Sequence, residues 1–370
     1  MKFMIFIVKS FIRLLHIFPI DNNKIFINNF YGNGYNENPK YLAEELLKKK
    51  KYKLYWVVKD MNTKLPKEIK KVKINSIPYF YTIATAKLWI SNVRLPAYFT
   101  KRKKQYYIQT AHGSLFFKKI EFDVLDKLDN YYKMKMYNDN KMMDLFISNS
   151  IYFDKLIRSA YGFQGEILKS GSPKDDEFFK EKDKNYFEKI GIKNKKVVLY
   201  APTFRNEYNN NPYDLDFKKV CEYLNKEKDE WVILIKMHPN VKEYKNLFTF
   251  DENIIDVAGY STEELVKNSD IVISDYSSVI FDAMIAGVPG IIYASDMDNY
   301  IKERGFYFDL NKLPFPLTTN TEEFIKSLNS KKFKNYKNEY KEYIKSDIGL
   351  YSNGKSSKMI VDYIEKNVLK

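Results

Sequence analysis

Residues 271–293 read IVISDYSSVIFDAMIAGVPGIIY, a stretch with two short apolar runs on either side of a helical segment. The runs at 271–274 and 290–293 have the composition of buried strands, and residues 278–286 have that of a helix. A strand, a helix and a second strand joined by short loops predict two parallel strands with the helix packed on the sheet.

The same alternation extends outward from this stretch in both directions. Ser261-Thr262-Glu263-Glu264 has the pattern of a capping box that opens a short helix. The stretches 322–343, which is rich in lysine, and 356–366 are expected to be helical. The remaining candidates are a helix at 41–51 and strands at 24–29, 52–58, 88–92, 106–110, 145–148, 197–200 and 232–236.

The pattern predicts the α/β class, with two doubly wound domains of the Rossmann type that face a central cleft. We expect the first domain at 21–172 and the second at 173–370, with Ser170–Asp176 (SGSPKDD) as the linker. Residues 1–20 form a separate N-terminal segment. Whether the last helix packs back on the first domain stays open.

Composition limits the possible partners. The 370 residues include 62 basic and 47 acidic side chains, a net charge of +15 that favours anionic partners. The single cysteine excludes an intrachain disulfide, and no Cys/His grouping has the spacing of a zinc site, so no metal site is expected. We find no P-loop, no dinucleotide fingerprint and no nucleic-acid-binding signature, so no nucleic-acid partner is expected.

The N-terminal segment, MKFMIFIVKSFIRLLHIFPI, is too short and too charged for a transmembrane helix. As a helix it places Lys2, Lys9, Arg13 and His16 on one narrow face, opposite a broad apolar surface. Two interpretations stay open: a helix at a membrane interface with its basic face toward lipid headgroups, or a helix that covers the core of the first domain. His16 receives no functional role.

Several residues of the second domain follow predicted strands directly. Ser274-Asp275-Tyr276-Ser277-Ser278 leads from a strand into a helix, and helix N-termini favour phosphate groups. The two serines add hydroxyl donors, and Asp275 is expected to fix the loop or to bind a hydroxyl. Asp282, one turn further on, is expected to brace the loop. A plain serine N-cap is the alternative interpretation.

Two cationic groups lie at another strand end of the same domain. Pro239 directs His238 away from the sheet, and Lys236 lies on the same side of the extended chain, so the pair is suited to a diphosphate. Ala201-Pro202-Thr203-Phe204-Arg205 ends a further strand, and Arg205 is a candidate for bidentate phosphate contact. Each of these residues also has a purely structural interpretation.

In the first domain, His112 follows a strand within Gln109-Thr110-Ala111-His112-Gly113-Ser114. Gly113 permits a sharp turn and a close approach of a ligand. A neutral imidazole at this position is suited to take a proton from an attacking hydroxyl. Two of the three histidines, His112 and His238, therefore stand at strand ends, one in each domain.

In combination, these motifs resemble those of the CDP-glycerol glycerophosphotransferases, which include teichoic acid primases and polymerases with a GT-B-like fold. The resemblance covers most of the chain and rests on an ordered set of motifs: Phe30-Tyr31-Gly32-Asn33-Gly34-Tyr35, Asn38-Pro39-Lys40-Tyr41, His112-Gly113-Ser114, Lys118-Lys119, Ser148-Asn149-Ser150, Gly171-Ser172-Pro173, Tyr200 to Arg205, His238-Pro239, Ser274 to Ser278, Phe281-Asp282, Tyr293, Asp296, Arg304 to Asp309 and Asn353-Gly354-Lys355.

The resemblance implies a metal-independent transfer of glycerol phosphate from CDP-glycerol to a hydroxyl of a lipid-linked or oligosaccharide acceptor, with release of CMP. It implies that His112 is the general base and that His238 stabilises the diphosphate. The donor is expected to contact Thr203, Arg205, Lys236, Asp275, Ser277, Ser278 and Asp282. The acceptor side is expected to involve Gly32, Asn38, Gly113 and Ser114.

The resemblance also implies a peripheral protein on the cytoplasmic face of the cell membrane, in contact with an anionic membrane surface. Lys236 stands where the family has arginine, and Ala283 stands where it has tyrosine, so the polyol of the donor is open. The sequence lacks the extra N-terminal domain of many polymerases, so addition of a few units, or a role in capsule synthesis, is an alternative. CDP-ribitol as donor, a GT-B glycosyltransferase with a nucleotide sugar, and a polymer-binding scaffold also stay open.

Overall fold

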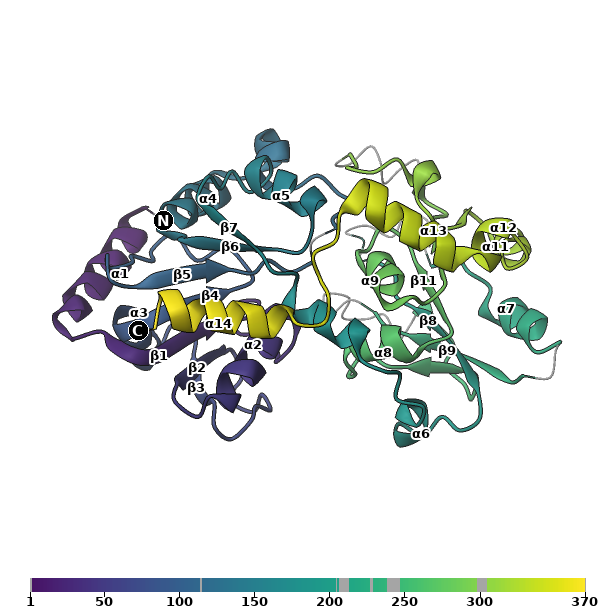
Figure 1. The fold of residues 1–370 in the computed structure, drawn as a ribbon, viewed down its shortest axis with the longest axis horizontal. Coiled ribbons are helices and arrows are strands. Elements are labelled where there is room, and N and C mark those ends of the chain that lie inside the picture. Colours follow the sequence, from purple (N-terminus) through teal and green to yellow (C-terminus); the bar gives the residue numbers. More distant parts are fainter. Residues whose placement is uncertain are drawn as a thin grey trace. The chain divides into compact units, whose positions relative to one another are not determined.

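The structure is a computed structural model that describes residues 2–113, 115–203, 205, 213–226, 229–237, 247–297 and 305–369. The chain forms two units (Figure 1). Unit 1 consists of Met1–Ser114, Ile120–Asp176 and Leu350–Lys370, and unit 2 consists of Leu115–Lys119 and Glu177–Gly349. The last helix, α14 (Ser356–Asn367), therefore belongs to unit 1.

Unit 1 is built on a parallel sheet of seven strands in the order β3-β2-β1-β4-β5-β6-β7. Most of the strands expected from the sequence are present within a few residues of their expected bounds, and two short edge strands are additional. The strands are β1 (Asp21–Asn28), β2 (Lys53–Val58), β3 (Lys70–Lys73), β4 (Ala86–Ser91), β5 (Tyr106–Gln109), β6 (Leu145–Ser148) and β7 (Glu166–Lys169).

The two faces of this sheet bury different side chains, because residues alternate along each strand. One face carries Ile25, Leu88 and Ile108, and α2 (Glu37–Lys48) and α14 pack on it. On the opposite face, Phe26 contacts the ring of Tyr79 from α3 (Ile77–Thr85). The other helices of unit 1 are α1 (Lys2–Leu14), α4 (Asn130–Met142) and α5 (Ile151–Arg158).

Unit 2 repeats the plan with six parallel strands in the order β10-β9-β8-β11-β12-β13. The strands are β8 (Lys196–Tyr200), β9 (Trp231–Ile235), β10 (Ile254–Asp256), β11 (Ile271–Ser274), β12 (Gly290–Tyr293) and β13 (Leu317–Thr318). Its described helices include α6 (Tyr186–Lys189), α7 (Phe217–Leu224), α8 (Thr262–Asn268) and α9 (Val279–Ala286). The capping box is present, since the Ser261 side chain accepts a hydrogen bond from the backbone N–H of Glu264.

The expectation of one helical stretch over 322–343 is too simple. The segment is divided into α11 (Thr321–Ser327), α12 (Lys331–Lys334) and α13 (Tyr336–Tyr343). Asn320 caps the start of α11, and Ser330 caps α12, because their side chains accept a backbone hydrogen bond. A polar residue such as Ser330 competes with helix continuation, which explains the break between α11 and α12.

The segment Ser170–Asp176 lies directly before the main part of unit 2, which starts at Glu177, but it is not an exposed loop. Ser170, Ser172 and Asp175 are buried. The carboxylate of Asp176 accepts hydrogen bonds from the backbone N–H groups of Ser356 and Ser357, and so caps α14. The segment is instead an internal hydrogen-bonding element of unit 1.

Both sheets place their first strand beside their fourth, with β1 next to β4 and β8 next to β11. The chain order reverses at these positions, and the loops on the carboxyl side of the two strands separate there. Polar ligands of doubly wound sheets bind at such points. The candidate ligand-binding loops are therefore those after β1, β4 and β5 in unit 1 and those after β8 and β11 in unit 2.

The N-terminal segment forms α1 and a 3-10 turn, η1 (Leu15–Ile17), and α1 contacts α3 at the outside of unit 1 (Figure 1). The basic side chains of this segment do not share one environment. Lys9 is half-buried and its ammonium donates to Asn138 of α4, whereas Arg13 is exposed. Eight large apolar side chains are exposed as well: Phe3, Met4, Phe6, Ile7, Phe11, Leu14, Ile17 and Phe18.

Candidate active site

The loops at the switch point of unit 1 are held by a chain of buried asparagine amides. Asn92, directly after β4, donates through Nδ2 to Oδ1 of Asn29, which lies directly after β1. The Oδ1 atom of Asn92 accepts from the backbone N–H of Phe30. Asn29 in turn donates to the carbonyls of Asn33 and Gly34. The loop over residues 30–34 is thereby fixed relative to β4.

His112 lies next to this loop. Its Nδ1 is 2.9 Å from the backbone oxygen of Asn92, and its ring meets that of Phe30 edge-on at 5.1 Å between centroids. A carbonyl oxygen only accepts hydrogen bonds, so Nδ1 carries the proton and Nε2 is the basic nitrogen of the neutral ring. The side chain is exposed to solvent, so a substrate can reach it.

The surroundings of His112 favour its neutral form. The pKa of His112 is lowered, first because nearby protein removes part of the solvation of the charged ring, and also by the positive charge of Lys174. The Asn92 carbonyl and the negative charge of Glu121 act in the opposite direction, and the net shift remains downward. A neutral imidazole with a fixed proton on Nδ1 is what general-base catalysis requires.

The remaining acceptor-side candidates determine the backbone conformation of these loops. Gly32 has φ +90°, and a Cβ atom there would lie 2.8 Å from the backbone nitrogen of Lys59, so only glycine fits. Gly113 has φ +75°. Asn38 is buried and donates to the carbonyls of Thr110 and Ala111. Ser114 lies outside the described residues.

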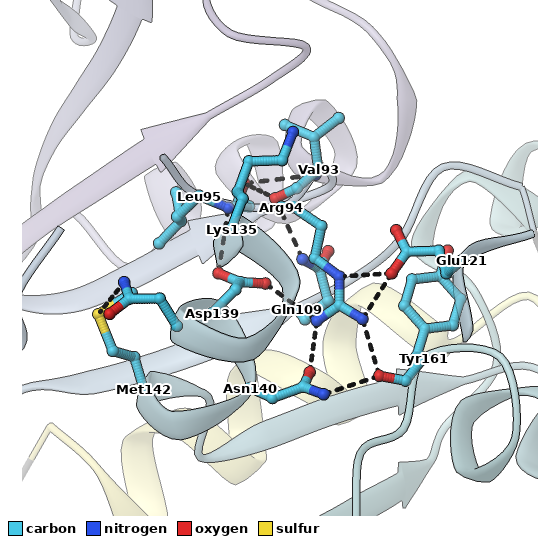
Figure 2. Close-up of polar contacts among 12 residues, drawn as sticks. Val93, Arg94, Leu95, Gln109, Glu121, Lys135, Asp139, Asn140, Met142 and Tyr161 are labelled. Carbon is cyan, nitrogen blue, oxygen red and sulfur yellow. Dashed lines mark hydrogen bonds and ion pairs between the residues drawn. The ribbon is translucent and has the colours of Figure 1, made fainter. Parts of the chain in front are cut away.

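A buried ionic cluster supports the same loops (Figure 2). Arg94, two residues after Asn92, forms ion pairs with Glu121 at 2.7 Å and with Asp139 at 3.3 Å. It also donates to the Tyr161 carbonyl and to the amide of Asn140. Breaking a buried pair of this kind leaves an uncompensated charge, so the cluster fixes the chain where it leaves β4.

In unit 2, Arg205 is occupied by protein partners. Its Nε and one terminal nitrogen donate to the two carboxylate oxygens of Asp296, at 2.7 and 3.0 Å. The same terminal nitrogen donates to Asp275, and the other donates to the carbonyl and hydroxyl of Thr203. These five contacts equal the five N–H groups of a guanidinium. The structure thus places Arg205 as a brace between strand-end loops.

Asp275 and Thr203 complete this brace. The carboxylate of Asp275 accepts from the backbone N–H of Thr203 at 2.8 Å and from its hydroxyl at 2.9 Å. It also accepts from the backbone N–H of Tyr276, and the Tyr276 hydroxyl donates to Asp296. Of the two roles expected for Asp275, the structure displays loop fixation.

The start of α9 has the features of a phosphate site. Ser278 is the N-cap residue of the helix, and its side chain makes no capping hydrogen bond. Ser277 and Ser278 are both partly exposed, whereas Asp282 in the first turn is buried. A helix N-terminus carries partial positive charge from its outward-directed N–H groups. The two serines therefore present hydroxyl and backbone donors together.

Lys236 follows β9 directly, and its ammonium donates to the carbonyls of Ala258 and Tyr260, both at 2.6 Å. These bonds use two of its three N–H groups and tie the end of β9 to the loop before α8. His238 lies outside the described residues, so its expected pairing with Lys236 stays a prediction.

The aromatic motif at 306–308 has a packing role in unit 2. Lys118 and Phe306 form an antiparallel bridge, and the backbone N–H of Tyr307 donates to the carbonyl of Phe117. The Phe117 ring is buried against Phe281 of α9 at 4.9 Å between centroids. The segment Leu115–Lys119 is thus fastened to the helix that carries the two serines.

Among the described residues, no group of three or more His, Cys, Asp or Glu side chains is arranged to hold a metal ion. Within the same part of the chain, no helix is both long and apolar enough to span a membrane.

The sequence profile of the family described as CDP-glycerol:poly(glycerophosphate) glycerophosphotransferase matches residues 10–366. The chain belongs to this family. The predicted family and its transferase class are thereby confirmed, and so is the α/β fold with two Rossmann-type domains.

Three similar proteins illustrate the match. A teichoic acid poly(glycerol phosphate) polymerase of Bacillus spizizenii is 32% identical over 88% of this chain and 87% of its own. One of Staphylococcus epidermidis is 32% identical over 93% of this chain, which spans about half (50%) of that relative's length. A structure of the wall teichoic acid polymerase TagF soaked with CDPG has 29% identity and a TM-score of 0.84, over 98% of this chain and 93% of that one.

Two residues of the site were not recognised in the sequence. Asn92 orients His112 through its carbonyl, and Gln109 contacts the loop that carries His112. A buried amide at the end of an apolar strand is the signal that both share, because such a group must find hydrogen-bond partners.

Proposed function

We propose that this protein transfers glycerol phosphate from CDP-glycerol to a hydroxyl of a lipid-linked or polymeric acceptor, in the synthesis of teichoic acid or a capsular polymer. Family membership supports the reaction type, and the TagF structure soaked with CDPG supports the donor. The observation that carries the proposal is the exposed ring of His112, whose Nδ1 proton is committed to Asn92.

In the proposed reaction, Nε2 of His112 takes the proton of the acceptor hydroxyl. The acceptor oxygen forms a bond to the phosphorus that bears glycerol, and the bond from this phosphorus to the bridging oxygen breaks. CMP leaves with the bridging oxygen. Charge developing on the phosphate oxygens is stabilised by the N-terminus of α9, with Ser277 and Ser278, and by His238.

This assignment changes the role of Arg205. Its five N–H groups are directed at Thr203, Asp275 and Asp296, so we propose that it holds the phosphate-binding loop in place rather than binding phosphate itself. Two N–H groups of the Lys236 ammonium bind carbonyls, and we propose that the third binds the donor.

The donor and the cofactor requirement are tested together. CMP release is measured with CDP-glycerol and CDP-ribitol in parallel, with and without EDTA, and the product is examined by phosphorus NMR. We expect release from CDP-glycerol, unaffected by EDTA, and a new phosphodiester signal. Release only from CDP-ribitol would change the donor, and transfer without phosphate in the product would indicate a glycosyltransferase.

We further propose that the protein is peripheral to the cytoplasmic membrane face and docks through the exposed apolar face of α1 and η1, defined by the eight side chains given above. Phe3 is 75% exposed and Ile17 is 81% exposed, and large apolar patches are unusual on a soluble surface. The flanking Arg13 is also exposed, which favours an anionic bilayer.

Vesicle sedimentation tests this proposal with a matched pair of variants. Met4→Glu places a charge on the apolar face, and Met359→Glu places one on a methionine of α14 that is also exposed. We expect Met4→Glu to weaken binding to anionic phosphatidylglycerol vesicles about tenfold or more, since burying the charge is costly, while Met359→Glu binds like wild type. Equal binding by both variants would exclude this face.

A further inference from the structure

The loop that carries His112 contains an unusual backbone conformation at Ala111. Ala111 has φ +53°, in the left-handed region that residues with a Cβ atom rarely adopt. Such a conformation persists only where the surrounding structure holds it, and it is often found at functional sites. The residue directly precedes His112, so it sets the direction in which the imidazole leaves the sheet.

Two buried amides hold the Ala111 residue from both sides. Its backbone N–H donates to Oε1 of Gln109 at 3.0 Å, and its carbonyl accepts from Nδ2 of Asn38 at 3.1 Å. Both side chains are 1% exposed. In a dry environment such bonds are strong, and an unpaired partner is costly.

Gln109 is itself fixed. Its Nε2 donates to the carbonyl of Val93 at 3.1 Å and to the hydroxyl of Tyr107 at 3.0 Å. Figure 2 shows Gln109 next to Arg94, at the centre of the buried ionic cluster. Together with the bond from the Ala111 N–H, the Gln109 amide therefore makes three hydrogen bonds within the protein, and these fix its orientation.

Asn38 is fixed in the same way. Its Nδ2 also donates to the carbonyl of Thr110, and its Oδ1 accepts from the hydroxyl of Ser172 at 2.8 Å and from the backbone N–H of Lys174 at 3.0 Å. Four hydrogen bonds satisfy the whole amide. It therefore connects the first turn of α2 to the His112 loop and to the segment that contains Lys174.

We propose that Gln109 and Asn38 are positioning residues for His112. They hold Ala111 in its left-handed conformation, and this keeps Nδ1 of His112 within hydrogen-bond distance of the Asn92 carbonyl. The inference rests on the proposed function only for its effect on turnover, because the geometry of the ring is measurable without substrate. Loss of either amide lets Ala111 relax, turns the ring and mixes its two neutral tautomers.

The unit offers a close control for Gln109. Gln105, immediately before the same strand, is 2% exposed, and its Nε2 also donates to two groups, the carbonyls of Ile83 and Ala86. Its Oε1 also accepts a backbone N–H, that of Arg102. The two glutamines thus match in burial and in hydrogen bonds, but Gln105 lies at the opposite end of β5 from His112.

The experiment compares Gln109→Met with Gln105→Met, because methionine keeps nearly the length and volume of glutamine without its polar atoms. Nitrogen NMR of 15N-histidine-labelled protein reports the tautomer and the pKa of His112, whose signals are identified by their absence in His112→Ala. The groups that act on its pKa are Glu121, Lys174 and the Asn92 carbonyl.

We expect wild type and Gln105→Met to show a His112 protonated at Nδ1. Gln109→Met is expected to show a tautomer mixture and a His112 pKa that rises toward that of a solvated histidine, because the ring gains solvation. The kcat for CMP release is expected to fall about 10- to 100-fold, with the KM for the donor changed less than about twofold, since misplaced catalytic groups affect kcat. Adding Ala111→Gly to Gln109→Met is expected to restore part of kcat, because glycine adopts the left-handed conformation without a Cβ clash.

Asn38→Ala provides a second, independent variant with the same expected tautomer change, and thermal unfolding confirms that each variant is folded. An unchanged His112 tautomer in both Gln109→Met and Asn38→Ala would overturn the inference. Equal losses of kcat in Gln105→Met and Gln109→Met would also overturn it. If the tautomer changes as expected while wild type releases no CMP, the positioning role stands and the proposed function fails.

Discussion

The Nδ1 atom of His112 lies 2.9 Å from the backbone oxygen of Asn92, and this contact assigns the proton of the neutral ring to Nδ1. Nε2 is then the nitrogen that accepts a proton from a substrate. Asn92 follows β4 and His112 follows β5, so two neighbouring strand ends define the base.

The pH dependence of turnover follows from the lowered pKa of His112. Neutral imidazole is the active form, and a lower pKa keeps it neutral to lower pH. The kcat/KM is therefore expected to be level from pH 8 to about 6.5 and to fall only below that range. Lys174→Met removes a charge that lowers this pKa and should move the acid limb upward. An acid limb well above pH 6.5 in wild type would contradict the assignment.

Arg205→Met tests whether Arg205 is a brace or a phosphate ligand. Removing the guanidinium leaves the buried Asp275 and the partly buried Asp296 without their cation, which is expected to cost about 3–5 kcal/mol of unfolding free energy. Denaturant unfolding measures this loss. Arg158→Met, at an exposed arginine whose described partners are carbonyls, is the control and should change stability little. A raised donor KM with unchanged stability would instead make Arg205 a ligand.

The serines at the start of α9 are expected to act on the donor and not on stability. Ser278 makes no capping bond, and Ser277 accepts only one long bond, from the backbone N–H of Val279 at 3.4 Å. The double variant Ser277→Ala/Ser278→Ala should therefore lower the unfolding free energy by less than about 1 kcal/mol. The loss of two hydroxyl donors to a phosphate is expected to raise the KM for CDP-glycerol about tenfold or more. Steady-state kinetics and thermal melts separate the two effects. A double variant with wild-type KM would remove these hydroxyls from the site.

The buried cluster around Arg94 predicts that replacing Arg94 lowers the unfolding free energy much more than replacing an exposed lysine does. Arg94→Met leaves the buried carboxylates of Glu121 and Asp139 without their arginine cation and is expected to cost about 3–5 kcal/mol. Lys48→Met removes an exposed ion pair with Glu45 and should cost less than about 1 kcal/mol. Denaturant unfolding of both proteins makes the comparison, and similar losses would show that the cluster does not carry the stability assigned to it.

Most of the fold was predictable, because buried parallel strands have a strong apolar signature. Residues 145–148, 271–274 and 290–293 are strands with the expected bounds. The short edge strands β3, β7, β10 and β13 were not predicted. The lysine-rich run 70–73, for example, has little apolar character. The break between α11 and α12 depends on a single polar cap, Ser330, which does not stand out in a lysine-rich stretch.

The site was predictable in its position but less so in its chemistry. His112 and the serines at 277 and 278 lie at strand ends, as the motifs indicated. The role of Arg205 depended on Asp296, which lies 91 residues away, and no local pattern connects the two. The same holds for Lys9, whose ammonium contacts Asn138 of α4, 129 residues away in the sequence.

The most direct test of the central claim is the rate of CMP release from CDP-glycerol by His112→Ala, with a water-soluble acceptor. His16→Ala is the matched control, because it removes a histidine outside the proposed site. Loss of a general base is expected to lower kcat by about 10²- to 10⁴-fold, while His16→Ala keeps the wild-type rate. A His112→Ala protein that releases CMP at the wild-type rate would contradict the account.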